Sequence, residues 1–236
     1  MTETATRATP RQRVRAELTA EIKEVARRHL AEHGADGLSL RAVAREVGMV
    51  SSAVYRYFPS RDDLLTALII DAYEAVGAAA EDAEATVRRR ADLMGRWLAL
   101  ATATRAWAVA HPQEWALIFG SPIPGYRAPT DTVDPAARIP ILLLALSTEA
   151  AERHGGAPLP DERSVPRGVH ADLKALRDAG GWDLPDSDIA HGIAAWTSLV
   201  GSISFELFGH LHNVIEDFDA YFAHQMRAVG LDLGLA

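Results

Sequence analysis

Hydrophobic positions along this chain recur at the three- and four-residue intervals of helices, and no segment sustains the alternation of a strand. The clearest short stripe, within residues 39–48, consists of Leu40, Val43, Ala44 and Val47. Ser39 stands just before this stripe, at the position of an N-cap, and Gly48 follows it, where a left-handed residue would turn the chain. These positions predict a short helix that ends in a glycine turn.

A second short helix is predicted directly after that turn. It begins near Ser51 and must end by Pro59, because proline cannot continue a helix. Two short helices around a glycine turn have the geometry of a helix-turn-helix, whose second helix lies in the major groove of double-stranded DNA. The pattern therefore indicates a DNA-binding protein.

The longer segment from Arg15 to Leu68 resembles the DNA-binding domain of TetR-family transcriptional regulators. Upstream of the helix-turn-helix, a predicted helix has an apolar face formed by Leu18, Ile22, Val25, Ala26 and Leu30. Downstream, the run Tyr55–Leu65 is similar to the family's link between the recognition helix and the fourth helix, with its aromatic residues, proline and basic residue. Ser60 and Asp63 resemble a capping box with Asp in place of the more usual Glu.

The resemblance implies a set of DNA contacts, at Ser39, Arg41, Ser51, Ser52, Tyr55, Arg56, Tyr57, Ser60 and Arg61. Arg56 is the best candidate for base readout, because a guanidinium can bind O6 and N7 of guanine together. Arg61, at the start of the next helix, is expected to bind a phosphate. Ser51 and Ser52 can donate to a phosphate or to a base edge.

Other side chains of the recognition helix should face the protein, namely Ala53, Val54 and Phe58. Two alternatives to DNA contact stay open. Tyr57 can belong to the core, and Arg41 can pair with Glu46 or with another surface acid.

Charge is divided unevenly along the 236 residues, although the formal net charge is −8. Residues 1–60 hold ten Arg and Lys against seven Asp and Glu, a net charge of +3, which leaves 14 basic and 25 acidic residues in the remainder. The basic end is attracted to a phosphate backbone, whereas the acidic remainder is repelled by it. Residues 1–14 are expected to form an arm, from which Arg7, Arg11 or Arg13 could reach a minor groove; a frayed terminus is the alternative.

The whole pattern predicts an all-α protein of about nine to ten helices. We expect a flexible arm at 1–14, a three-helix helix-turn-helix domain at 15–62, and a helical ligand-binding and dimerisation domain at 63–236. The helices predicted after the helix-turn-helix are 61–83, 85–110, 112–119, 135–154, 165–179, 187–208 and 214–229. An irregular, proline-rich stretch is expected at 121–138, and a glycine stop at Gly155 and Gly156.

The C-terminal part resembles a regulatory-domain subclass of the family that is named for tryptophan, histidine and glycine positions in its penultimate helix. Trp196, Gly201, Gly209 and His210 carry this resemblance, whereas Val200 stands where the histidine is expected. The segment 111–138 looks like a form found in actinobacterial regulators.

The family resemblance also implies a homodimer on a palindromic operator, with the two recognition helices about 34 Å apart. The last two long helices are expected to pair with their mates in a four-helix interface. They carry the apolar side chains Ile193, Leu199, Val200, Ile203, Leu207 and Leu211.

Aromatic residues in the part of the chain that follows the helix-turn-helix domain predict a pocket for a small apolar or aromatic effector. Its candidate lining is Trp97, Trp107, Trp115, Phe119, Trp196 and Phe205. The alternative for each tryptophan is that it fills the core. Effector binding would alter the spacing of the two DNA-binding heads and release a repressor from its operator. Linkage then requires that DNA weaken effector binding by the same factor. An activator or a ligand-independent regulator is the alternative.

Catalytic motifs are missing from the sequence, which has no Gly-x-Ser-x-Gly, no phosphate-binding glycine loop, no His-Glu-x-x-His and no cysteine. Glu206 and His210 lie one helical turn apart, but no paired Glu-x-x-His motif accompanies them, so neither a metal nor a cofactor is expected. A helical interaction module with an unused helix-turn-helix is a third class, which the serines and arginines of the recognition helix disfavour. The apolar runs are too short to span a membrane, and no signal peptide is present, so we expect a cytoplasmic protein.

Overall fold

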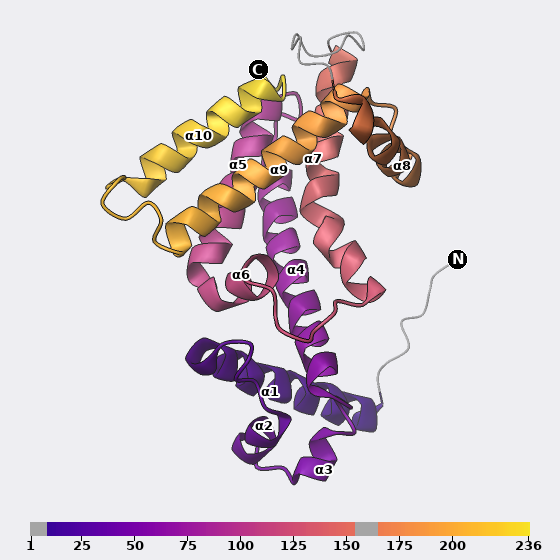
Figure 1. Cartoon of the computed structure of the whole chain (residues 1–236), viewed down its shortest axis with the longest axis vertical. Helices are drawn as coiled ribbons and strands as arrows, with labels where there is room; N and C mark the ends of the chain where they lie inside the picture. The colour runs from indigo at the N-terminus through magenta and orange to yellow at the C-terminus, as the bar shows by residue number, and fades with distance from the viewer. Residues whose placement is uncertain (1–8, 154–164) are drawn as a thin grey trace. The chain divides into compact units, whose positions relative to one another are not determined.

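The computed structural model describes residues 9–153 and 165–236, in which all regular secondary structure is helical (Figure 1). The helices are α1 (Pro10–His33), α2 (Leu40–Glu46), α3 (Ser51–Val54), α4 (Arg61–Ala85), α5 (Leu93–Ala110), α6 (Pro112–Phe119), α7 (Val133–Arg153), α8 (His170–Gly180), α9 (Asp186–Leu207) and α10 (Phe218–Asp232), with short 3-10 turns at Thr130–Thr132 and Arg167–Val169. Arg7 of the expected arm and the expected stop at Gly155 and Gly156 lie outside the described residues.

The chain divides into two compact units that are not continuous in sequence. The head unit comprises the chain up to Ala72 together with residues Gln113–Thr132, and the body unit comprises Tyr73–Pro112 and Val133–Ala236. Helix α4 passes from the first unit into the second. The segment 113–132, which was predicted to belong to the 63–236 domain, packs with α1 and α4.

The head unit is built around the apolar stripes predicted from the sequence. Helices α1, α2 and α3 and the first turns of α4 enclose one core (Figure 1). Its buried members include Ile22, Val25, Ala26, Leu30, Val43, Ala44, Val54, Phe58, Leu64 and Leu65. Gly48 adopts a φ of +73°, the left-handed conformation that a side chain would strain, so the glycine turn between α2 and α3 is confirmed.

The body unit packs its helices around α5 and α9. Helix α9 contacts α5, α7, α8 and α10, and α10 also lies along α5 (Figure 1). Leu100, Leu143, Leu199 and Ile203 are fully buried in this unit. Within residues 9–153 and 165–236, no helix combines the length and the apolar character needed to cross a membrane.

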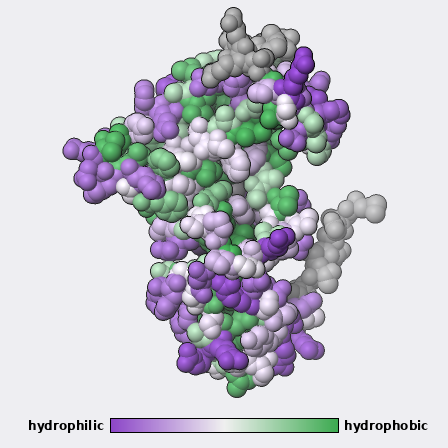
Figure 2. Space-filling model, viewed as in Figure 1, coloured by the Kyte–Doolittle hydropathy of each residue, from purple (hydrophilic) through white to green (hydrophobic). Residues whose placement is uncertain are grey.

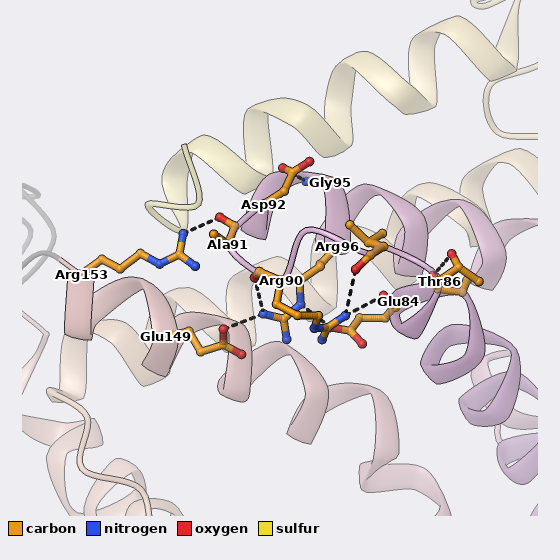
Figure 3. A network of polar contacts seen from close by, with 11 residues as sticks. Glu84, Thr86, Arg90, Ala91, Asp92, Gly95, Arg96, Glu149 and Arg153 are labelled. Carbon is orange, nitrogen blue, oxygen red and sulfur yellow. Dashed lines mark hydrogen bonds and ion pairs between the residues drawn. The ribbon is translucent and has the colours of Figure 1, made fainter.

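A cluster of ion pairs joins α4, α5 and α7 inside the body unit (Figure 3). Glu84 and Arg96 are both about 5% exposed, and the Nε of Arg96 donates to the carboxylate of Glu84. Arg90, from the loop before α5, binds the same carboxylate. On the other side, Nη1 of Arg96 donates to Glu149 Oε2 at 2.6 Å. Both buried charges are thus compensated.

A second ion-pair cluster ties α5 to α9 and α10. The guanidinium of Arg105 donates from Nε and Nη2 to the carboxylate of Glu206, at 2.6 and 2.7 Å, and from Nη1 to Asp219 at 2.6 Å. Its central carbon lies 5.4 Å from the centre of the Phe222 ring, within cation–π range. These contacts hold the end of α9 and the start of α10 against α5.

Several helices begin elsewhere than the sequence predicted. Helix α8 begins at His170 rather than at 165, after the 3-10 turn Arg167–Val169. For three others, local capping bonds fix the start. Helix α1 begins at Pro10, inside the expected arm, since Thr9 and Gln12 form a capping box. Helix α5 begins at Leu93 rather than near residue 85, where Asp92 accepts a hydrogen bond from the Gly95 amide. Helix α10 begins at Phe218 rather than at 214, after its Asp217 cap.

The expected irregular stretch at 121–138 is shorter in the structure. It ends at the 3-10 turn of residues 130–132, and α7 begins at Val133, two residues before the predicted start. Pro135 falls in the first turn of α7, where the missing proline N–H leaves no hydrogen bond unmade. The other three prolines of the stretch, Pro122, Pro124 and Pro129, lie between α6 and the 3-10 turn, where no helix forms, as predicted.

Candidate nucleic-acid interface

The recognition helix α3 is a single short turn that presents one face to the core and one to solvent. Ala53, Val54 and Phe58 are buried in the head unit, as predicted. Tyr55 and Arg56 lie in the turn that directly follows α3, and both are exposed. The exposed face therefore carries a guanidinium, a phenol and, at Ser52, a hydroxyl, which are groups that read base edges and phosphates.

Helix α2 is fixed to α1 by an acidic residue at its end. Glu46 accepts a hydrogen bond from Arg28 Nη2 at 2.7 Å and forms a second one with His29 Nε2 at 2.9 Å. These two bonds, that with Arg28 more than that with His29, hold the pKa of the Glu46 carboxyl below its ordinary value. Because Glu46 is occupied in this way, it is not the partner of Arg41. Ser39 stands at the N-cap of α2 without a side-chain capping bond, and both Ser39 and Arg41 are exposed.

The start of α4 has part of the capping box that was predicted from the sequence. The Ser60 hydroxyl accepts from the Asp63 amide at 3.1 Å and donates to the Asp63 carboxylate at 2.6 Å, so half of a capping box is present. Arg61 Nη2 donates to the carbonyl of Ala35 at 2.7 Å, which ties α4 to the loop after α1. Its part-exposed guanidinium has further donors, so binding of a phosphate by Arg61 stays a prediction.

Two residues near this surface, Val50 and Arg15, were not among the contacts predicted from the sequence. Val50, which precedes α3, exposes 71% of its surface, and an apolar side chain there suits the methyl group of thymine. Arg15 of α1 contacts the recognition segment, residues 51–58, by a hydrogen bond to Arg56, 41 residues away in sequence. The only signal in the sequence is its spacing, since Arg15 continues the stripe of Leu18 and Ile22 on one face of the helix.

Tyr57 is half-buried and packs against the head core, in agreement with the alternative that Tyr57 belongs to the core. The central carbon of the Arg15 guanidinium lies 5.4 Å from the centre of its ring. Tyr57 thus supports the recognition segment from the protein side, and any contact with DNA would come from the part of the ring that remains exposed.

The segment 113–132 is held to the head unit by polar and apolar contacts. Glu114 of α6 pairs with Arg27 of α1 at 3.0 Å, and the Tyr126 hydroxyl shares a hydrogen bond of 2.9 Å with Thr66 of α4. Leu117, Ile123 and Tyr126 pack against the head core. A displacement of this segment would therefore act directly on α1 and α4 of the head unit.

The six aromatic residues proposed to line an effector pocket are distributed over both units. Trp115 and Phe119 belong to the head unit, where Trp115 is fully buried and its ring centre lies 4.5 Å from that of Phe119. Trp97, Trp107, Trp196 and Phe205 belong to the body unit. The pocket itself stays a prediction.

Within the body unit these aromatic residues have different environments. Trp97 is fully buried and donates its indole N–H to the Met226 carbonyl at 2.6 Å, as a core residue does. Trp107 is half-buried and stacks on His111. Phe205, by contrast, is 53% exposed on α9. The residue type alone did not distinguish these positions.

Glu206 and His210, which were predicted to lie one helical turn apart, each contact another side chain in the structure. Both Glu206 carboxylate oxygens accept from Arg105, and His210 lies against the Phe205 ring. Across the residues that the structure describes, no group of three or more His, Asp and Glu side chains could hold a metal ion.

Comparison with protein families identifies both parts of the chain. Residues 22–68 match the family described as "Bacterial regulatory proteins, tetR family", and residues 97–229 match "Tetracyclin repressor-like, C-terminal domain". The first match covers the helix-turn-helix, and the second covers the segment that holds the tryptophan, histidine and glycine positions.

Individual proteins agree with these matches. HTH-type transcriptional regulator Rv1816 of Mycobacterium tuberculosis is 40% identical over 204 residues, which cover 84% of each chain. The solved structure of SCO4313 is 35% identical and has a TM-score of 0.76, over 94% of this chain and 98% of that one. The TetR family transcriptional regulator PfmR from Thermus thermophilus shares the fold, with 18% identity, a TM-score of 0.53, and coverage of 90% and 96%.

Proposed function

The chain belongs to the TetR family of transcriptional regulators, and on that premise we propose that it is a homodimeric repressor, released from a palindromic operator by a small apolar or aromatic effector. The family and these relatives are transcriptional regulators rather than enzymes. Since the operator lies on bacterial DNA, we place its action in the cytoplasm.

The observation that carries the DNA-binding part is the division of residues 51–58, which comprise α3 and the turn after it, into buried and exposed side chains. The apolar residues Ala53, Val54 and Phe58 are buried in the head core, whereas Ser52, Tyr55 and Arg56 are exposed. Residues 1–60 carry a net charge of +3 in a protein of net charge −8, so the potential favours approach of this end to phosphate.

Arg56→Ala is expected to cost about 1–3 kcal/mol of operator affinity and to relax specificity at one base position, because it removes a bidentate base contact. Arg61→Ala should weaken binding to all sequences alike and reduce the salt dependence, because it removes a phosphate contact. The measurement is a gel shift over a salt series, with DNA from the region upstream of the protein's own gene and with a scrambled sequence as the control. If the two variants behaved alike, this division of roles would be wrong.

The outer surface of α9 and α10 supports the proposed dimer. Exposed apolar side chains on this surface are Ile193, Phe205, Tyr221 and Leu231. Phe205 and Tyr221 border a surface hollow together with Gly201, and Figure 2 shows hydrophobic atoms among polar ones over the region of α9 and α10. Of the interface residues expected from the sequence, Leu199 and Ile203 are instead fully buried in the core of the body unit, so the interface is assigned to the opposite face of α9.

Phe205→Lys is expected to raise the dimer dissociation constant at least about tenfold, because an ammonium group would lose its water in an apolar interface. The matched control is Leu176→Lys, at an exposed apolar position of α8. Sedimentation velocity across a concentration series measures the mass of both variants and of the wild type. A monomeric wild type, or an unchanged dimer in Phe205→Lys, would contradict the proposed interface.

The position of the segment 113–132 supports regulation by an effector. This segment directly follows α5 of the body unit in sequence, yet its contacts at Arg27, Thr66 and the head core belong to the DNA-binding unit. A ligand that favours a different position of this segment would shift α1 and α4, and linkage then requires operator DNA to weaken binding of that ligand equally. Screening aromatic compounds for release of the gel shift tests this, and compounds that strengthen the shift would favour an activator or a co-repressed regulator.

A further inference from the structure

The recognition segment of this protein has little helix to stabilise it. Helix α3 extends over Ser51–Val54, and the chain continues as turns to Tyr57. The carbonyls of Ala53 and Val54 accept backbone hydrogen bonds from residues 56–58. The carbonyl of Arg56, further along, is bound by a side chain from another helix.

That side chain is Arg15 of α1, which makes two contacts with the end of the recognition segment. Its Nη2 donates to the Arg56 carbonyl at 3.4 Å, a long hydrogen bond, and its guanidinium carbon lies 5.4 Å from the centre of the Tyr57 ring. Cations within about 6 Å of an aromatic ring centre are attracted to its face. Arg15 therefore holds two consecutive residues at the end of the exposed base-reading surface.

We propose that Arg15 is a positioning residue for base recognition: it fixes the backbone of Arg56 and the ring of Tyr57, so that the Arg56 side chain leaves the protein in the direction needed to read a base. The inference rests on the DNA-binding role of the helix-turn-helix. Orientation matters for base contacts, which require defined geometry, far more than for phosphate contacts, which a flexible cation can make.

Arg15→Ala is expected to lower the affinity for operator DNA roughly 5- to 30-fold, the size that losing one exposed cation–π contact and one hydrogen bond implies. The affinity for scrambled DNA should fall much less, and the slope of log affinity against log salt should stay unchanged. Equal losses on both DNAs, with a slope smaller by about 0.9, would show that Arg15 binds a phosphate itself and would overturn the proposal. An unchanged operator affinity would overturn it too.

A double-mutant cycle separates positioning from any direct role. If Arg15 acts through Tyr57, then Arg15→Ala in a Tyr57→Leu background should cost much less than in the wild type, because the shared contact is already gone. Additive losses would count against the proposal. Arg15→Lys keeps the charge but not the planar fork, so it should recover only part of the discrimination between operator and scrambled DNA.

Hydrogen exchange provides a readout that needs no DNA. In Arg15→Ala, the peptide that covers residues 51–58 should take up deuterium faster, while peptides from the body unit keep their wild-type rates. Unchanged exchange in residues 51–58 would overturn the proposal even if no operator were found. Failure of the proposed function would appear differently, as a wild-type protein that binds no DNA but still shows this change in exchange.

Discussion

Glu84→Gln is expected to lower the free energy of unfolding of the body unit by about 3–5 kcal/mol, the cost of removing one partner from a buried ion pair. The side chains of Arg96 and Glu84 are 5% and 7% exposed, so water cannot replace the lost carboxylate. Arg96 would keep Glu149, but Arg90 would lose its carboxylate partner in the cluster (Figure 3). The substitution preserves side-chain volume, so the loss reports charge rather than a cavity.

The same residue predicts a pH dependence. Burial by itself would raise the pKa of the Glu84 carboxyl, but hydrogen bonds from Arg96 and Arg90 outweigh burial and hold the pKa below its ordinary value. The unfolded chain therefore binds more protons between the two pKa values, so this stabilisation is present above the unfolded pKa and is lost as the pH falls through the folded one. Glu84→Gln should remove that part of the acid sensitivity.

Urea unfolding at neutral and acidic pH, followed by circular dichroism, measures both effects. The matched control is Glu149→Gln, whose carboxylate binds the same arginine but is 39% exposed, and about 0–1 kcal/mol is expected for it. A loss of less than about 1 kcal/mol in Glu84→Gln, equal to that of the control, would show that water reaches the cluster.

Trp97→Ala is the second large expected effect, a loss of about 3–5 kcal/mol in the free energy of unfolding. Trp97 is fully buried on α5, and its indole N–H bonds the Met226 carbonyl of α10. A Cβ added at Gly230 would lie 2.8 Å from the Trp97 ring, so α10 approaches the indole closely. Truncation would leave a cavity between α5 and α10 that their backbones can close only in part.

Trp107→Ala provides the comparison on the same helix. Trp107 is half-buried and stacks on His111, so a smaller loss of stability is expected for it. Thermal unfolding of both variants, with and without an effector once one is found, separates the roles. If Trp97→Ala left stability nearly intact but abolished effector-induced release from DNA, Trp97 would be a pocket residue rather than a core residue.

The helix-turn-helix could be predicted from the sequence because its determinants are local. An apolar stripe, a glycine that must turn and a proline that must stop all lie close together, from Ser39 to Phe58 and the following Pro59. The inward orientation of Val54 and Phe58 followed from the same spacing, and burial confirms it. Which exposed side chains touch DNA stays a prediction from family resemblance.

The errors in helix ends have a local cause that periodicity does not reveal. Between α4 and α5, the Thr86 hydroxyl donates to the Ala83 carbonyl and Arg90 donates to the Glu84 carbonyl, so side chains satisfy the last carbonyls of α4 and the helix stops. The alanine-rich sequence there continues to read as helix. Asp92 and Asp217 are residues of a type that favours N-caps, and both cap the starts of α5 and α10. The predicted starts followed the apolar pattern instead.

The helical class, the DNA-binding motif and the uneven charge follow from the amino-acid sequence, because each depends on residues close together in the chain. Three other features emerge only when the helices are packed: residues 113–132 join the head unit, Trp97 is buried while Phe205 is exposed, and Arg15 binds the end of the recognition segment. Those outcomes depend on pairs such as Arg15 and Arg56, 41 residues apart, or Trp97 and Met226, 129 residues apart. A residue's own spacing shows that it needs a partner, and the packing of whole helices selects which one it receives.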